Sequence, residues 1–124
     1  RSAGTEALRS MLLRAEVEVS EGRQVVIMPE GTRRAPDDPP AYKPGAAALY
    51  ARLGVPCVPF ALNSGLFWPR RRFLRYPGTI VISFLDAIPP GLPRKTFQPR
   101  LEEVIESETM RLVAEGRETL LRYK

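Results

Sequence analysis

The chain has 124 residues, of which 44% are hydrophobic and 27% charged, so its composition is that of one folded domain and excludes a disordered segment. It contains no histidine and one cysteine, Cys57, which excludes an imidazole base, a disulfide framework and a cysteine-rich zinc site within this chain. The net charge is +5, concentrated in residues 66–95, and this basic patch favours an anionic partner: a phosphate ligand, a nucleic acid or an acidic membrane surface.

The first half of the chain alternates helical and strand patterns. Apolar residues at spacings of three and four predict a helix over 5–20, and Gly22 follows it where a left-handed cap is expected. A β-branched run predicts a buried strand over 24–28, followed by a loop over 29–43. An alanine-rich segment predicts a short helix over 44–53.

The second half of the chain continues with strands and ends in a long helix. Apolar runs predict strands over 57–62 and 79–85, separated by an irregular segment over 63–78 that carries most of the basic patch. After a Pro/Gly turn at 88–93, residues 98–123 are predicted to form a helix with a proline and acidic residues near its start.

This order of elements predicts an α/β fold. The apolar strands do not alternate with polar residues, which favours strands buried on both faces and therefore a mixed, mostly parallel sheet flanked by helices. No internal repeat or linker divides the chain, so residues 1–124 are expected to form part of one domain.

The most informative loop follows the strand predicted over 24–28, at the edge where open α/β sheets bind ligands. Gly31 lets the backbone approach an anion, Thr32 supplies a hydroxyl, and Arg33 supplies a planar fork that suits a phosphate. Glu30 would repel a phosphate, so it is expected to hold an arginine or to accept a hydrogen bond from a substrate hydroxyl. A strand–turn with solvated charges is the open alternative.

A second cation follows in the same loop. Lys43 precedes the helix predicted over 44–53, where backbone N–H groups and the positive end of the helix dipole favour an anion. It lies ten residues after Arg33, so both side chains can clamp one phosphate. A surface lysine before a helix is the alternative.

Three blocks of sequence resemble the 1-acyl-sn-glycerol-3-phosphate acyltransferase family. They are residues 29–33 (Pro-Glu-Gly-Thr-Arg), 42–45 (Tyr-Lys-Pro-Gly) and 54–61 (Gly-Val-Pro-Cys-Val-Pro-Phe-Ala), and the resemblance extends over about residues 1–92. It implies an incomplete glycerolipid acyltransferase-like fold, with the chain as the C-terminal part of a single acyltransferase domain. Met28 and Arg34, which flank the first block, depart from the family pattern.

The resemblance also implies roles for particular residues. Arg1 matches the arginine that closes a phosphate-binding motif, residues 29–33 match the glycerol phosphate motif, and an apolar motif that shapes the acyl or acceptor site matches Val58, Pro59 and Phe60. Together with Lys43, the expected phosphate-binding residues are Arg1, Glu30, Gly31, Thr32, Arg33 and Lys43.

The catalytic H-x-x-x-x-D motif of the family is absent, because the chain has no histidine. We expect that motif and membrane-associating helices upstream of Arg1, and we expect the chain alone to be inactive. The resemblance implies a bacterial parent enzyme at the cytoplasmic face of the inner membrane. That enzyme would transfer an acyl group from acyl-CoA or acyl-carrier protein to 1-acylglycerol-3-phosphate, giving phosphatidic acid, with no metal or other cofactor. An acyltransferase for another lysolipid and a non-catalytic module that binds anionic lipid are the alternatives.

The basic patch mixes arginines with aromatic residues. Trp68, Arg70, Arg71 and Arg72 are candidates for contact with an anionic membrane surface, where amphipathic rings and arginines are favourable. A loop that faces the phosphopantetheine of the donor, or one whose rings lie in the core, is also consistent with the pattern. No nucleic-acid motif is present, and no apolar run approaches the roughly 20 residues of a membrane-spanning helix.

Overall fold

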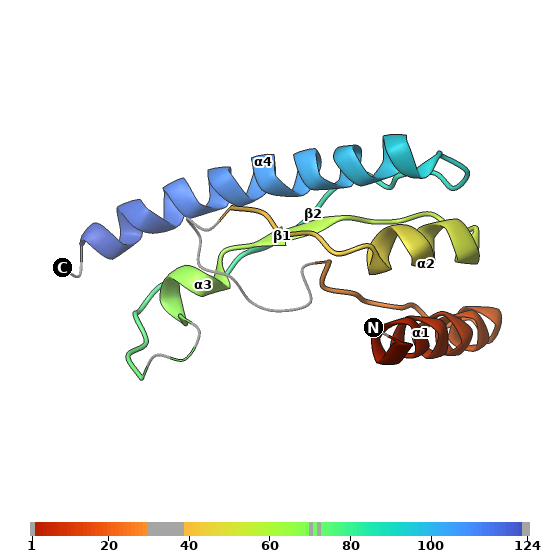
Figure 1. Ribbon diagram of the computed structural model, residues 1–124. Helices are drawn as coiled ribbons and strands as arrows, with labels where there is room; N and C mark the ends of the chain where they lie inside the picture. The colour runs from red at the N-terminus through yellow and green to blue at the C-terminus, as the bar shows by residue number, and fades with distance from the viewer. Residues whose placement is uncertain (1, 30–38, 70, 72, 123–124) are drawn as a thin grey trace.

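The structure, a computed structural model, describes residues 2–29, 39–69, 71 and 73–122. A long C-terminal helix lies along one face of a two-stranded sheet, a shorter helix packs against it beyond one end of the strands, and the N-terminal helix packs on that shorter helix (Figure 1). In chain order the elements are α1 (Ser2–Ser20), α2 (Gly45–Leu53), β1 (Phe60–Leu62), α3 (Ser64–Phe67), β2 (Ile82–Phe84) and α4 (Arg94–Leu121). None of the described helices combines the length and the hydropathy needed to cross a bilayer.

The N-terminal helix α1 is confirmed and begins at Ser2, three residues before the predicted start. Gly22 follows it with a φ of 83°, the left-handed conformation expected after a helix. The helix packs on α2, and Arg52 of α2 donates to the Glu16 carboxylate at 2.8 Å. Since both charged side chains are largely exposed, this ion pair contributes at most about 1 kcal/mol, and packing holds the two helices together.

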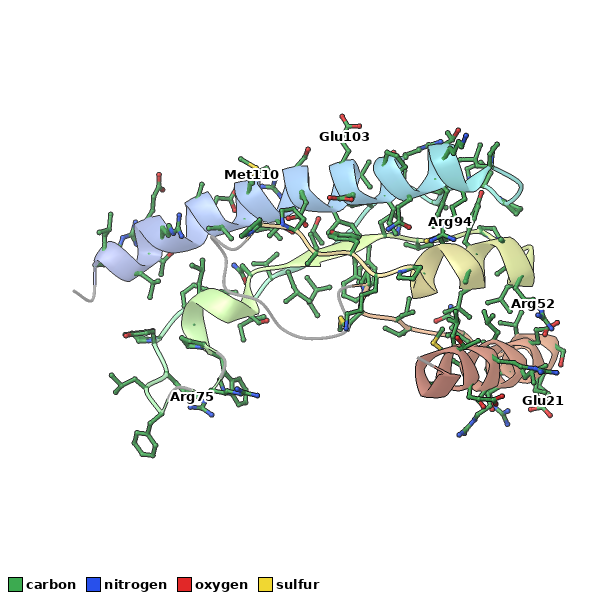
Figure 2. All side chains as sticks on the ribbon, viewed as in Figure 1. Glu21, Arg52, Arg75, Arg94, Glu103 and Met110 are labelled. Atoms are coloured by element: carbon green, nitrogen blue, oxygen red, sulfur yellow. The ribbon has the colours of Figure 1, made fainter. Side chains whose placement is uncertain are left out.

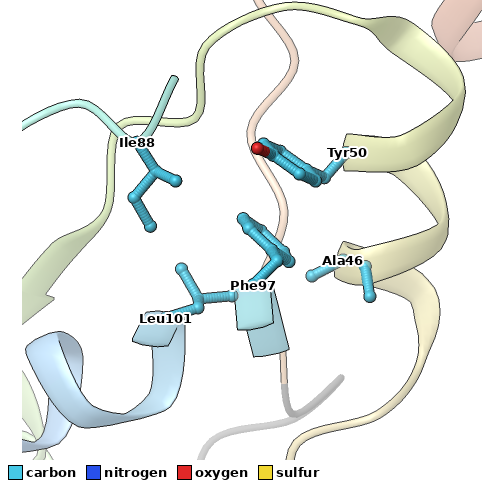
Figure 3. Close-up of a cluster of buried hydrophobic side chains, with 6 residues drawn as sticks. Ala46, Tyr50, Ile88, Phe97 and Leu101 are labelled. Carbon is cyan, nitrogen blue, oxygen red and sulfur yellow. The ribbon is translucent and has the colours of Figure 1, made fainter. Parts of the chain in front are cut away.

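The largest buried cluster joins α2 to the start of α4 (Figure 3). The rings of Tyr50 and Phe97 stack with centroids 3.8 Å apart, and Phe97 is only 1% exposed. The Tyr50 hydroxyl donates to the carbonyl of Pro89 and accepts a hydrogen bond from the Leu92 N–H at 3.0 Å. This buried aromatic pair therefore fixes the Pro/Gly turn before α4 as well as the two helices. The whole cluster comprises Ala46, Ala47, Tyr50, Ile88, Phe97 and Leu101.

The strands β1 and β2 pair antiparallel, with Phe60 opposite Phe84 and Leu62 opposite Ile82. The prediction of a mostly parallel sheet is therefore not confirmed for the described residues. The prediction relied on the lack of alternation in the apolar runs, which we interpreted as burial on both faces. In the structure, the runs do not alternate because the open face of an antiparallel pair is also apolar.

Both strands are shorter than predicted, and for β1 a proline explains the late start. Pro59 has no N–H to donate to a ladder, so β1 begins after it, and the carbonyl of Pro59 accepts from the Leu85 N–H at 2.9 Å. Before Pro59, Cys57 forms only an isolated bridge with Ile88. The strand predicted over 24–28 is not observed, because no described segment forms a ladder with it.

Helix α4 begins at Arg94, four residues before the predicted start, with Pro93 as its N-cap. Pro99 therefore lies inside the helix and not in its first turn. The helix covers one face of the sheet, where Ala61 is 2% exposed. Toward its C-terminus it contributes Val113 and Leu120 to a second cluster with Leu66 and Phe67 of α3. Its predicted end agrees with the observed one to within two residues.

Candidate functional site

The loop singled out by the sequence is closed at its base by one backbone hydrogen bond. The N–H of Lys43 donates to the carbonyl of Pro29 at 2.8 Å. Pro29, which opens the Pro-Glu-Gly-Thr-Arg block, and Lys43 therefore lie side by side in the backbone. Pro29 is the one residue of the Pro-Glu-Gly-Thr-Arg block that the structure describes, and its carbonyl lies against the Lys43 backbone.

The residue before Lys43 is tied to the long helix. The Tyr42 hydroxyl donates to a carboxylate oxygen of Glu106 on α4 at 2.8 Å, across 64 residues of sequence. Both side chains are partly buried, so this contact is shielded from solvent more than a surface hydrogen bond. Lys43 thus follows a residue anchored to α4 and is itself anchored through its backbone to Pro29, while its side chain is exposed.

Helix α2 begins two residues after Lys43, and its N-terminus favours an anion. The first N–H groups of a helix have no acceptor within the helix, and the aligned peptide dipoles place positive charge there. The N-cap Pro44 supplies no side-chain cap, and the first turn of α2 carries no acidic residue. A phosphate near Lys43 would therefore meet both an ammonium group and the helix dipole.

Several predicted site residues lie outside the described residues. They are Arg1, Glu30, Gly31, Thr32, Arg33, Arg70 and Arg72. The clamp of Arg33 and Lys43 on one phosphate consequently stays a prediction.

The three residues predicted to shape the acyl or acceptor site have different environments. Pro59 is buried, Phe60 is partly buried and Val58 is 52% exposed. The Phe60 ring lies against that of Phe84, with the centroids 5.8 Å apart. Because side chains alternate along a strand, Phe60 projects to the side of the sheet opposite Ala61 and α4.

That side of the sheet is apolar and open. Ile82 is 54% and Phe84 72% exposed, and both share the face of Phe60. We call the four residues on this side of the ladder the apolar sheet face: Phe60, Leu62, Ile82 and Phe84. The sequence analysis missed Ile82 and Phe84, although their spacing of two within the predicted strand was the signal that could have found them.

The opposite face carries a charged network. The Ser83 hydroxyl donates to Glu108 at 2.5 Å, and Arg111 donates to the two oxygens of the same carboxylate at 2.8 and 2.7 Å. The hydrogen bonds from Arg111, then that from Ser83, lower the pKa of Glu108 to about 2. A carboxylate that stays ionised at neutral pH and is fully engaged makes a poor proton acceptor, so this network attaches α4 to β2 and is not a catalytic base.

Cys57 is also unsuited to catalysis. Its backbone exchanges hydrogen bonds with Ile88 at 2.9 and 2.7 Å, which holds it in a bridge beside the main core cluster. Burial raises the pKa of the Cys57 thiol, so the nucleophilic thiolate is disfavoured. Across the described part of the chain, no three carboxylate, thiol or imidazole side chains gather into a metal-binding group.

Two of the residues proposed to face a membrane lie within the described part of the chain. Trp68 is 48% exposed, and Arg71 is exposed with a φ of 57°. The alternative in which the rings of this segment lie in the core holds for Phe67, which is buried, and not for Trp68.

Comparison with known proteins gives two matches. A family model described as Acyltransferase matches residues 2–63. Over 82 residues, which are 66% of this chain, the sequence is 34% identical to the 1-acyl-sn-glycerol-3-phosphate acyltransferase of Pseudomonas aeruginosa. The matched segment covers 32% of that protein, so the chain spans about a third of its length. No match was found among solved structures.

Proposed function

Because the chain belongs to the acyltransferase family, we propose that it is the phosphate-binding part of an enzyme that acylates 1-acylglycerol-3-phosphate. The acyl group would come from acyl-CoA or acyl-carrier protein, and the product would be phosphatidic acid. The name of the Pseudomonas aeruginosa relative supports this lysolipid as the acceptor. The enzyme would meet its lipid substrate at the cytoplasmic face of the inner membrane.

The observation that carries the proposal is the hydrogen bond from Lys43 to Pro29, 2.8 Å long. It joins the two ends of the loop that contains Arg33, and Lys43 precedes the first residue of α2 by two positions. Charge-assisted hydrogen bonds to a phosphate are among the stronger polar contacts in proteins. A phosphate held here would fix the glycerol backbone of the acceptor, which lowers the entropic cost of aligning its free hydroxyl.

The apolar sheet face would accommodate a hydrocarbon chain. Val58 and Phe60, which the family resemblance assigns to the acyl or acceptor site, lie beside or on this face, and Phe84 extends it. An acyl chain laid over half-exposed aromatic and aliphatic side chains gains about 25 cal/mol for each Å² of apolar surface removed from water.

The chemistry needs a base that this chain does not contain. In the proposed reaction, the glycerol hydroxyl oxygen attacks the thioester carbonyl, a base accepts the hydroxyl proton, and the carbon–sulfur bond breaks to release the thiol. The chain has no histidine to accept that proton. Its residues would bind and orient the acceptor, and the 124-residue chain alone is expected to transfer no acyl group.

Binding of a short-chain acceptor tests the phosphate site. We expect the chain to bind 1-hexanoylglycerol-3-phosphate, below its micelle concentration, and not 1-hexanoylglycerol, which lacks the phosphate. Lys43→Ala and Arg33→Ala should each weaken calorimetric binding by about tenfold or more, the loss of a charged hydrogen bond. Lys95→Ala, which removes an exposed cation at the start of α4, is the matched control and should bind like the wild type.

Four results would contradict the proposal or its choice of acceptor. Equal binding of both ligands would remove the role of the phosphate, and wild-type binding by both loop variants would place the site elsewhere. Acyl transfer by the isolated chain, measured by thiol release from acyl-CoA, would show that no outside base is needed. Tighter binding of a lysophospholipid with a larger headgroup would favour another lysolipid as acceptor.

A further inference from the structure

We propose that residues 68–76, the basic–aromatic loop, dock the protein on an anionic bilayer by inserting the Phe73 and Leu74 side chains among the lipid headgroups. The loop is part of the connection from α3 to β2, and Figure 2 shows Arg75 on it, on the side of α3 away from α4. The inference rests on the proposed function only for the choice of a lipid partner, because docking requires no acyl transfer.

The base of the loop is fixed to the body of the protein. The Tyr76 N–H donates to the Phe67 carbonyl at 2.8 Å, so the two ends of the loop meet. Tyr76 also packs against the second buried cluster, which contains Phe67. A Cβ atom at Gly78 would lie 2.1 Å from the Phe67 ring, so the returning backbone passes against that ring at a distance only glycine allows.

The tip of the loop exposes large apolar side chains. Phe73 is 97% exposed and Leu74 63%, with Trp68 beside them at 48%. Placing such side chains in water forgoes about 1.5–3 kcal/mol for each one that could be buried. Their neighbours are arginines, and apolar side chains rimmed by polar residues mark an interaction site.

The Arg75 side chain satisfies a backbone carbonyl at the tip of the loop, which favours contact with a medium of low polarity. The Arg75 guanidinium donates to the Phe73 carbonyl at 2.9 Å and lies over the Trp68 ring, 4.7 Å from its centroid. An unsatisfied carbonyl is costly near hydrocarbon, and the hydrogen bond from Arg75 removes that cost for Phe73. The same guanidinium joins the two limbs of the loop across Trp68.

The charge around the tip matches an anionic surface. No aspartate or glutamate occurs between residues 39 and 85, whereas Arg70, Arg71, Arg72 and Arg75 lie in the loop. Each arginine near an anionic leaflet contributes about 1 kcal/mol of attraction. The loop therefore combines an attractive charge with an apolar tip, the two signals that stable association with a membrane requires.

Lipid explains the tip better than an acidic macromolecule does. A single-stranded nucleic acid would stack on rings, but Leu74 offers no ring and Trp68 already faces Arg75. An acidic protein surface would pair with the arginines but would leave the 97% exposed Phe73 in need of an apolar pocket. A bilayer interface accepts the arginines, the ring and the aliphatic side chain together.

Trp68 is the only tryptophan and reports directly on this loop. We expect its fluorescence to shift to shorter wavelength when the 124-residue chain meets vesicles of phosphatidylglycerol and phosphatidylcholine. Lipids brominated high on their acyl chains should quench it. Pure phosphatidylcholine vesicles should bind much more weakly, because the electrostatic attraction is missing.

Two loop variants test the two contributions to binding. Phe73→Ser/Leu74→Ser should weaken vesicle co-sedimentation by at least about tenfold through the loss of apolar burial. Replacement of Arg70, Arg71 and Arg72 by Gln should weaken it by about a hundredfold on anionic vesicles. Met110→Ser/Leu121→Ser, which removes two side chains of α4 that are 72% and 73% exposed, is the matched control and should bind like the wild type.

Wild-type vesicle binding by the Phe73→Ser/Leu74→Ser variant, with an unchanged circular dichroism melt, would overturn the proposal. So would vesicle binding without quenching of Trp68 by brominated lipid, or a loop variant that loses only binding to single-stranded DNA or to acyl-carrier protein. Two different measurements distinguish failure of the phosphate site from failure of membrane docking. Lys43→Ala should lose the soluble lysophosphatidate and keep vesicle binding, and the Phe73→Ser/Leu74→Ser variant should do the reverse.

Discussion

The two faces of the β1–β2 sheet differ in a way that hydropathy alone does not reveal. Under α4 the sheet presents Ala61, which is 2% exposed, and Ser83, which is hydrogen bonded to Glu108. On the other face it presents Phe84, which is 72% exposed. The covered face uses small side chains because the helix backbone approaches it closely, whereas the largest apolar side chains lie where nothing described here covers them. Large apolar residues in a strand therefore do not identify its buried face.

The largest effect is expected where the covered side continues into the main core cluster. Phe97→Ala should lower the free energy of unfolding by about 3–5 kcal/mol, because it empties a site that is 1% exposed and removes the ring stacked on Tyr50. Urea denaturation measures this loss. Met110→Ala on the same helix, at a 72% exposed position, should change the value by no more than about 0.5 kcal/mol. A similar loss of unfolding free energy in both variants would contradict the difference between the buried and the exposed position.

Enlarging a side chain under α4 should have the next largest effect. Ala61→Leu adds volume to a position that is 2% exposed, so it should lower the free energy of unfolding by about 1–3 kcal/mol. Ala51→Leu, at an exposed position of α2, is the control and should leave the free energy nearly unchanged. A stable Ala61→Leu variant would mean that α4 does not pack closely on β1.

Acid should weaken the hydrogen bonds that Ser83 and Arg111 donate to Glu108 on the covered face of the sheet. The pKa of Glu108 falls to about 2 in the folded chain, chiefly through hydrogen bonds from Arg111, against an ordinary value of 4.5. Its contribution to stability is therefore present above about pH 4.5 and is lost as the pH falls through about 2. Glu108→Gln should be less stable than the wild type at pH 7, and the difference should shrink over that range. A difference that stays constant with pH would contradict this account, and Ser83→Ala should show a smaller change of the same sign.

The smallest effect is expected on the apolar sheet face. Phe84→Ser should change the free energy of unfolding by less than about 1 kcal/mol, because the side chain is 72% exposed and contacts mainly the Phe60 ring. A loss as large as that of Ala61→Leu would show that this face is covered in solution, and sedimentation velocity would then show whether a second copy covers it.

Helices α1, α2 and α4 could be predicted from sequence because their apolar spacing of three and four is a local property, whereas the four-residue α3 falls in the segment predicted to be irregular. Gly22 and Gly54 follow α1 and α2 in the left-handed conformation, as helix ends favour. The strands could not be placed as well, because a strand depends on its partner. Residues 24–28 have the composition of a strand but no described ladder, and Pro59 delays the start of β1.

The candidate site could be predicted only in part, because only some of its contacts join residues that are close in sequence. The short separation of Lys43 from the Pro-Glu-Gly-Thr-Arg block suggested a shared phosphate, and in the structure the Lys43 N–H is bonded to Pro29, the first residue of that block. The sequence could not reveal the hydrogen bond from Tyr42 to Glu106, which spans 64 residues. Nor could it show that Phe73, three residues beyond Arg70, is the most exposed of the large apolar side chains described.

The single hydrogen bond between Lys43 and Pro29 also sets how the intervening segment can evolve. The entropic cost of closing a loop rises by only about 0.6 kcal/mol for each doubling of its length. Insertions or deletions near the exposed Pro39 and Pro40 could therefore accumulate between related proteins while both ends of the segment keep their positions.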